Sequence, residues 1–161
     1  MSNEVQLREE IEQLRETIRK NEIVIADLSA PIIPSIIPST ILVPLTGALT
    51  NERFSSIQTK ILTRIQTEKA DTVIIDFTAI TYREIDQLGM EHLGDWITQL
   101  RDSLRLMGVE TIFTGFSSGL VQEMVKSNID TSQFVVHSTF RTGLQYLMKK
   151  KGLEFVQVQP N

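Results

Sequence analysis

Residues 73–77 read Val73-Ile74-Ile75-Asp76-Phe77, a short apolar run typical of a strand that is buried on both faces of a sheet. Such strands occur where helices cover both sides of a parallel sheet, so the neighbouring segments should be helical. The segment before the run fits, because Thr50 can cap a helix. The apolar residues of that helix share one face: Phe54, Ile57, Ile61 and Ile65. The stretch therefore predicts an α/β fold.

The same alternation continues on both sides. Strands are predicted at residues 41–45, 111–113 and 134–136, and a short edge strand broken by prolines at 32–37. One long helix carries Leu93, Trp96, Ile97, Leu100, Leu104 and Met107, with Trp96 in the core, and ends at Gly108. A second, capped by Ser117 or Ser118, carries Leu120, Val121, Met124 and Val125, and a third carries Phe140, Leu144, Leu147 and Met148. An irregular stretch is expected between Phe77 and Leu93.

Strands alternating with helices indicate βαβ units with right-handed crossovers. The sequence therefore predicts one α/β domain over residues 30–152, with a mostly parallel mixed sheet and flanking helices. The tail, residues 153–161, carries Leu153, Phe155, Val156 and Val158 and is expected either to add an edge strand or to stay loose.

Residues 1–29 have the heptad pattern of a coiled-coil-like helix. Isoleucine recurs at position a and leucine at d, a choice that favours two parallel strands. Glu10 and Arg15 fall where they can pair between chains. Asn21, at d, would penalise other registers. The predicted dimer interface is Leu7, Ile11, Leu14, Ile18, Asn21, Ile25 and Leu28. The alternative is an amphipathic helix that lies on its own domain.

The composition limits the function. The chain of 161 residues is 41% hydrophobic, carries a net charge of −4 and has no cysteine, which fits a cytoplasmic globular protein with no disulfide or thiolate chemistry. The acidic balance argues against nucleic-acid binding, and no apolar run has the length of a membrane span. His92 and His137 share no metal-ligand spacing, and nucleotide-binding glycine strings are absent, so we expect no metal or cofactor.

One string has the form of a catalytic motif. Gly115-Phe116-Ser117-Ser118-Gly119 fits G-x-S-x-G and is followed by Asp130 and His137, the chain order of an α/β-hydrolase triad. The spacing leaves too little chain to place an acid and a histidine around the sheet. We therefore expect a helix cap here, and no enzyme.

Four strings follow one another in a characteristic order between about residues 28 and 150. They are Leu28–Pro34 leading into Ile41–Gly47, then Ile74–Thr78, Arg105–Glu110 and Ile112–Ser117. Together they resemble the STAS domain of RsbR-type stressosome proteins. The resemblance implies an assembly of STAS domains that captures a serine/threonine kinase and frees it under stress. The bacterial anti-sigma-factor antagonists are similar, with a Ser or Thr phosphorylated at the start of the helix after the central strand.

The family pattern at that helix start is an acid followed by Ser or Thr. Counting from Asp76 gives Glu84-Ile85, and counting back from Gly108 gives Gly89-Met90; neither pair has an acceptor. The resemblance thus implies a replaced phosphoacceptor at the equivalent region, Glu84, Ile85 and Asp86. The two acids either supply a permanent charge or suit the helix dipole, and we favour the second. Thr114 matches a family threonine and is the remaining candidate acceptor; its alternative role is a turn hydroxyl that bonds the backbone.

The resulting expectation is a non-enzymatic regulator or scaffold of a bacterial partner-switching pathway, in the general stress response or the control of a sigma factor. It would be a homodimer through the N-terminal helix and would contact other STAS proteins and a serine/threonine kinase through residues 79–91. The alternative is a STAS module whose backbone N–H groups in that turn bind a small anion or nucleotide.

Overall fold

The computed structural model describes residues 2–28 and 30–161, with side chains for 2–25 and 30–161. Its sheet has five strands in the order β1-β2-β3-β4-β5. The strands are β1 (Ile33–Pro34), β2 (Thr40–Pro44), β3 (Thr72–Asp76), β4 (Glu110–Thr114) and β5 (Val135–His137). β1 is antiparallel to β2, and the other pairs are parallel. The expected mixed, mostly parallel α/β fold is confirmed.

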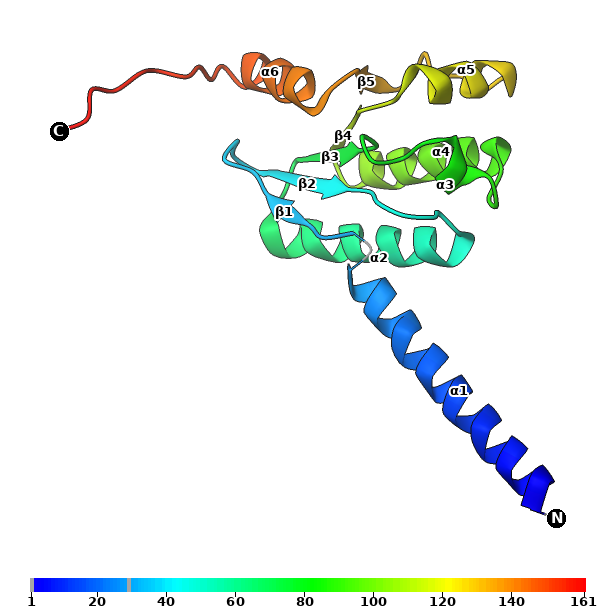
Figure 1. Ribbon diagram of the computed structural model, residues 1–161. Coiled ribbons are helices and arrows are strands. Elements are labelled where there is room, and N and C mark those ends of the chain that lie inside the picture. The colour runs from blue at the N-terminus through cyan, green and yellow to red at the C-terminus, as the bar shows by residue number, and fades with distance from the viewer. Residues whose placement is uncertain (1, 29) are drawn as a thin grey trace.

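The helices in chain order are α1 (Ser2–Leu28), α2 (Asn51–Glu68), α3 (Tyr82–Ile85), α4 (Met90–Leu106), α5 (Ser118–Lys126) and α6 (Phe140–Lys150). Apolar residues of α2, α4 and α5 form the main core against one face of the sheet. On the other face α6 packs against a smaller core. Figure 1 shows α1 projecting away from this body and the C-terminal tail leaving from the end of α6.

The main core forms as the apolar periodicity predicts. The Thr50 side chain accepts a hydrogen bond from the Arg53 N–H, which caps α2 and satisfies a free helix-terminal donor. The four expected apolar residues of α2 are buried. Trp96 of α4 stacks on Phe54, with ring centroids 3.9 Å apart, so its predicted place in the core is confirmed.

On the α6 side, one row of apolar side chains crosses the sheet. Ile33, Leu42, Ile74, Ile112 and Val135 are successive register partners, so their side chains share one face. Leu147 of α6 covers the middle of the row, where Ile74 and Ile112 are fully buried. Cover decreases towards β1: Leu42 is half-buried and Ile33 is 45% exposed.

A glycine brings α6 close to β4. A Cβ built at Gly143 would lie 2.5 Å from Cγ2 of Thr114, closer than two carbon atoms can approach. The helix therefore needs hydrogen at this position to reach its place on the sheet.

The C-terminal end of α6 is tied to the sheet by two lysines. Lys150 pairs with Glu110, and this hydrogen bond raises the pKa of Lys150. Lys151 donates to Asp71 Oδ1 at 2.8 Å and to the Pro38 carbonyl at 2.6 Å. Burial acts to raise the pKa of Asp71, but hydrogen bonds, first from Lys151, outweigh it and lower that pKa. The root of the tail is thus fixed next to the β1–β2 turn.

The structure adds detail at three places where the sequence pattern was weak: residues 82–85, α5 and the tail. Residues 82–85, within the stretch expected to be irregular, form the one-turn helix α3. Of the four apolar residues expected in α5, Leu120 and Met124 are buried, whereas Val121 and Val125 are 42% and 61% exposed. The tail adds no strand, and Phe155 is 79% exposed.

The helix α1 does not lie on its own domain. All of its described side chains, from residue 2 to 25, are exposed. The predicted seam residues keep between 46% and 56% of their surface in solvent: Leu7, Ile11, Leu14, Ile18 and Ile25. Asn21 is exposed as well, and the side chain of Leu28 lies outside the described residues. A continuous apolar stripe in solvent is a surface without a partner.

Candidate interaction surface

The segment between β3 and α4 is anchored in the main core by three buried apolar side chains. Ile80 and Ile85 are essentially inaccessible to solvent, and Leu88 is 8% exposed. The Phe77 N–H donates to the Thr114 carbonyl at 2.8 Å, and the Leu49 N–H donates to the Glu84 carbonyl at 2.8 Å. The backbone of this segment is therefore fixed in place, although most of its side chains face solvent.

The exposed part of residues 78–92 forms one polar patch, which we call the helix-start surface. Tyr82 stands 51% exposed at its centre, and Arg83 and Asp86 are exposed beside it. Glu91 and His92 continue the patch on the first turn of α4. An exposed aromatic ring among polar side chains on a rigid frame is typical of a protein-contact surface.

Glu84 caps its own helix. Its Oε2 accepts hydrogen bonds from the Thr81 hydroxyl and from the Thr81 N–H, the latter at 2.7 Å. These bonds lower the pKa of Glu84, so the carboxylate stays charged at neutral pH. The carboxylate of Glu84 therefore caps the N-terminus of α3, and this supports the local, helix-terminal role that we favoured for this acid.

The other two residues of the predicted phosphosite-equivalent region lie on opposite sides of the chain. Ile85 is 0% exposed and belongs to the main core, whereas Asp86 faces solvent. The structure therefore gives the isoleucine a packing role and leaves Asp86 as the acid free to meet a partner.

Thr114 is the last residue of β4, and its hydroxyl belongs to a hydrogen-bond network at the end of the sheet. Its side chain is 0% exposed, and its hydroxyl donates to Asp76 Oδ1 at 2.7 Å. The same oxygen accepts from the Thr78 hydroxyl at 2.9 Å. The candidate phosphoacceptor therefore bonds a carboxylate across the sheet instead of nearby backbone. A phosphate on Thr114 would require this end of the sheet to open.

This network yields a stability prediction. Asp76→Ala leaves the buried Thr114 hydroxyl without its acceptor, and an unpaired buried polar group costs about 1–3 kcal/mol. We expect the free energy of unfolding in urea to fall by that amount. Asp76→Asn, which keeps an acceptor oxygen, should lose less, and Asp86→Ala, at an exposed acid, should unfold like the parent chain. Equal loss in all three variants would contradict the network.

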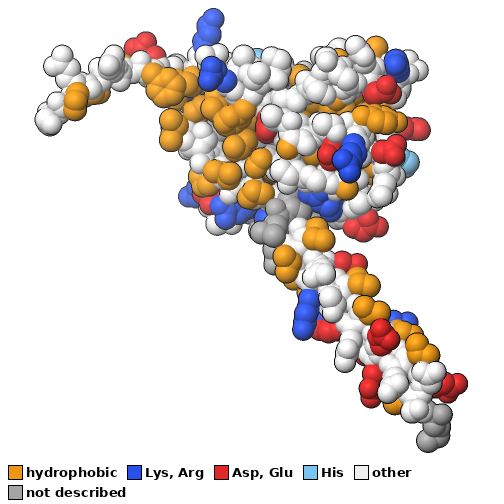
Figure 2. All heavy atoms as spheres, in the orientation of Figure 1, with side chains coloured by type: hydrophobic (Ala, Val, Ile, Leu, Met, Phe, Trp, Pro, Cys, Tyr) orange, Lys and Arg blue, Asp and Glu red, His pale blue; other side chains and the backbone are white. Residues whose placement is uncertain are grey.

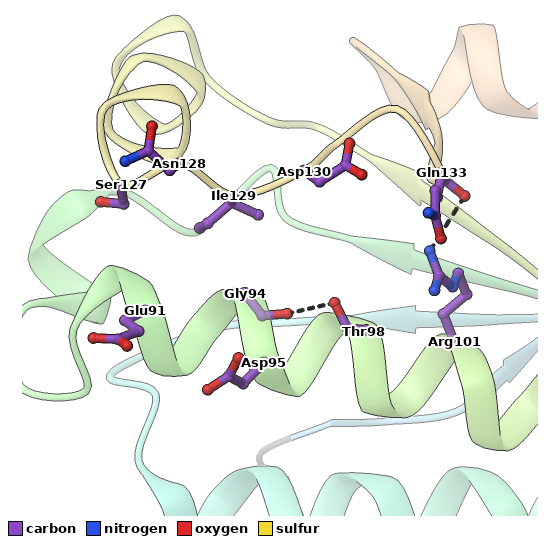
Figure 3. Close-up of a pocket in the computed structure, with 10 residues that line it drawn as sticks. All are labelled: Glu91, Gly94, Asp95, Thr98, Arg101, Ser127, Asn128, Ile129, Asp130 and Gln133. Carbon is purple, nitrogen blue, oxygen red and sulfur yellow. Dashed lines mark hydrogen bonds between the residues drawn. The ribbon is translucent and has the colours of Figure 1, made fainter.

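A groove lies beside the helix-start surface, between α4 and the loop that follows α5. It has a volume of about 400 Å³ and is lined by Glu91, Gly94, Asp95, Thr98, Arg101, Ser127, Asn128, Ile129, Asp130 and Gln133. Figure 3 shows Glu91 and Asp95 on α4 on one side of the groove and Asp130 on the loop opposite. Gly94 lets the loop approach, because a Cβ there would lie 2.9 Å from Ile129 Cγ1.

The rim of this groove is acidic. Arg101 pairs with Asp102 at 2.7 Å, donates to the Gln133 carbonyl and lies over the Phe134 ring, so its charge is engaged locally. Asp130 accepts from the hydroxyl and N–H of Ser132, which lowers its pKa. The groove is open and polar, whereas sites for small molecules are usually enclosed and mostly apolar. It is therefore better suited to contact with a segment of another protein.

Residues 27–143 match the family model of the STAS domain, which covers more than half of the chain. The chain belongs to the STAS domain family. It is 26% identical over 142 residues to the RsbT co-antagonist protein RsbRA of Bacillus subtilis, an alignment covering 88% of this chain and 49% of RsbRA. The chain spans about half the length of the curated relatives it matches.

Solved structures show the same fold. A single-residue variant of the RsbS protein of Moorella thermoacetica superposes with a TM-score of 0.60 at 14% identity, covering 77% of this chain and 98% of that one. A chain described under "Molecular architecture of the stressosome, a signal integration and transduction hub" superposes with a TM-score of 0.58 at 12% identity, covering 75% and 98%. The expected STAS fold is thus confirmed.

Five backbone donors of the STAS domain's 79–91 turn are already hydrogen-bonded within the turn or its flanks. Ile80, Glu84, Leu88 and Gly89 donate to backbone carbonyls within residues 77–85, and Thr81 donates to Glu84. With an acidic rim alongside, this turn presents a poor anion site. The alternative function, binding of a small anion or nucleotide at this turn, therefore gains no support from its geometry.

The hydrolase-like residues of the STAS domain have separate structural roles. Ser117 Oγ accepts from the Leu120 N–H as the cap of α5, Asp130 bonds Ser132, and the His137 ring lies beside Tyr146 at 4.7 Å between centroids. Within the described part of the chain, no group of three or more acidic or histidine side chains is placed to hold a metal. None of its described helices is long and apolar enough to cross a membrane.

Sequence reasoning did not find the groove or the acceptor role of Asp76. The groove joins α4 to a loop more than thirty positions further along the chain, and no local pattern links them. Asp76 ends an apolar strand, and Thr114 ends the neighbouring one at the matching register position. The sequence does contain a signal for this contact, because both strands end in a polar residue and parallel neighbours end at the same edge of the sheet. That signal predicts that Asp76 and Thr114 lie side by side.

Proposed function

We propose that this STAS domain is a non-enzymatic regulator or scaffold of a cytoplasmic partner-switching pathway in the bacterial general stress response. In this proposal it contacts other STAS domains and a serine/threonine kinase through the helix-start surface and its acidic groove. The observation that carries the proposal is the helix-start surface itself, an exposed aromatic and polar patch on buried apolar anchors. Similarity to RsbRA, a protein described as a co-antagonist, supports the same class of role.

We further propose that the usual phosphoacceptor is replaced. Ile85 lacks a hydroxyl and is buried, and Thr114 is closed off by its bond to Asp76. The module would then respond to the state of its partners, while its own contact surface keeps a constant charge. Asp86 and Glu91 supply that charge, because both face solvent.

The proposal also includes a homodimer through α1. The apolar stripe of this helix is fully outside the domain, and its Ile/Leu heptad favours two parallel strands. In such a dimer the two helix-start surfaces are presented on one rigid stalk, which would allow one dimer to hold two partner domains.

Charge reversal on the patch tests the contact surface. Asp86→Lys combined with Glu91→Lys should weaken binding to a STAS partner and a kinase from the same bacterium by roughly tenfold or more, because it breaks charge complementarity without touching a buried residue. Binding is measured by biolayer interferometry at fixed ionic strength, with Glu9→Lys and Glu12→Lys, two exposed acids of α1 outside the seam, as the control with the same change of charge. Equal affinity for both double variants would place the contact elsewhere.

A further inference from the structure

The α6 face of the sheet is only partly covered at its β1 end, where Ile37 is buried but its neighbours are not. Its row of side chains runs from buried Ile112 and Ile74 to half-buried Leu42 and then to Ile33, which is 45% exposed. Ile36, in the turn after β1, is 85% exposed. Figure 2 shows apolar side chains gathered over this side of the body, below the root of the tail. We call the surface of Ile33, Ile36, Leu42 and half-buried Met148 the open sheet end.

The tail of the same chain is an apolar segment without cover. Phe155, Val156 and Val158 are 79%, 71% and 81% exposed, and Gln157 lies between the two valines. Aromatic and β-branched residues favour an extended strand. In the described structure the tail has no regular secondary structure and pairs with none of the strands.

The tail is directed away from its own sheet. The Leu153 N–H donates to the Met148 carbonyl, and Gly152 has φ +69°, which closes α6 and sets the exit direction. Lys151 holds that exit against the β1–β2 turn. Between Leu153 and Gln159 there is no Gly, Pro, Asn or Asp to reverse the chain. Figure 1 shows the tail leading outward from the end of α6.

We propose that the tail of one copy packs on the open sheet end of a second copy, and that the exchange is reciprocal. One chain carries both an unpaired apolar strand segment and an unpaired apolar sheet surface, so two copies related by a two-fold axis satisfy both at once. Pro34 removes a backbone donor from β1, so the contact is made by side chains over the face more than by hydrogen bonds at the edge. The contact is separate from the α1 seam and does not depend on it.

Cysteine cross-linking of the whole chain tests this exchange, because the parent protein has no cysteine. An Ile36→Cys copy is mixed with a Gln157→Cys copy under mild oxidation. We expect a disulfide-linked pair at about tenfold or more the yield of a Gln66→Cys and Gln157→Cys mixture, because docking holds the thiols at high effective concentration. Gln66 is exposed on α2, on the other side of the sheet.

Two further variants separate the possible occupants. Adding Phe155→Ser and Val158→Ser to the Gln157→Cys copy should reduce the yield to the level of the control pair, since the anchoring side chains are lost. A single chain with both Ile36→Cys and Gln157→Cys should form links between chains at moderate concentration. A link formed only within one chain would show that the tail folds onto its own sheet and would overturn the proposal. Equal yields in the test and control mixtures would overturn it too.

Discussion

In a chain whose tail contact is removed by Phe155→Ser and Val158→Ser, Ile11→Asp combined with Ile18→Asp should convert the protein from a dimer to a monomer. Both isoleucines occupy position a of the heptad and are 46% and 55% exposed in the single chain, so they are available to a second helix. In a parallel dimer the double variant would place four carboxylates in one apolar seam, and burying unpaired charges is prohibitive. Size-exclusion chromatography with light scattering should show the mass fall from twice 18.3 kDa to 18.3 kDa.

The control adds the same charges to the same helix outside the seam. Gln13→Asp and Ile23→Asp fall at the outward positions c and f, and Ile23 is 51% exposed. This variant should keep the dimer mass, because its carboxylates remain in water. A parent chain that is monomeric at micromolar concentration would remove the stalk from the proposed function. So would a seam variant whose mass equals that of the control.

Gly115→Ala should strongly destabilise the domain. Gly115 has φ +79°, a conformation that costs an L-residue about 1–2 kcal/mol. Its new Cβ would also lie 2.6 Å from the Thr78 nitrogen and 2.9 Å from Asp76 Oδ1. These neighbours are backbone and a bonded carboxylate, so they cannot give way cheaply; overpacking of this kind costs about 1–3 kcal/mol.

The two contributions predict a loss of about 2–5 kcal/mol, a large share of a typical domain stability of about 5–15 kcal/mol. The urea midpoint and the thermal midpoint should both fall. Gly119→Ala is the matched control: Gly119 lies in α5, and nothing stands within 4 Å of its built Cβ. That variant should be neutral or slightly more stable, because Ala is the better helix former. Similar midpoints for the two variants would show that the end of β4 is not rigid.

Much of the fold could be read from the chain because each element has a local cause. The run at residues 73–77 is apolar on both sides and forms β3, and the spacing of Phe54 and Ile57 with Thr50 ahead of them forms α2. The heptad of the first residues forms α1, and Trp96 lies where its helical phase put it. In every case the period of apolar residues reports which side of an element is buried.

Other features depend on which element covers which, and no local period contains that information. Val121 and Val125 are as apolar as their neighbours Leu120 and Met124, yet the packing of α5 leaves them in solvent. Ile33 continues an apolar row that α6 is too far away to cover. Residue chemistry and periodicity determined the elements, their order and the apolar stripe of the stalk. Only tertiary packing, through contacts between distant parts of the chain, decided that Thr114 is closed by Asp76, that Ile85 is core, and that one end of the sheet stays open.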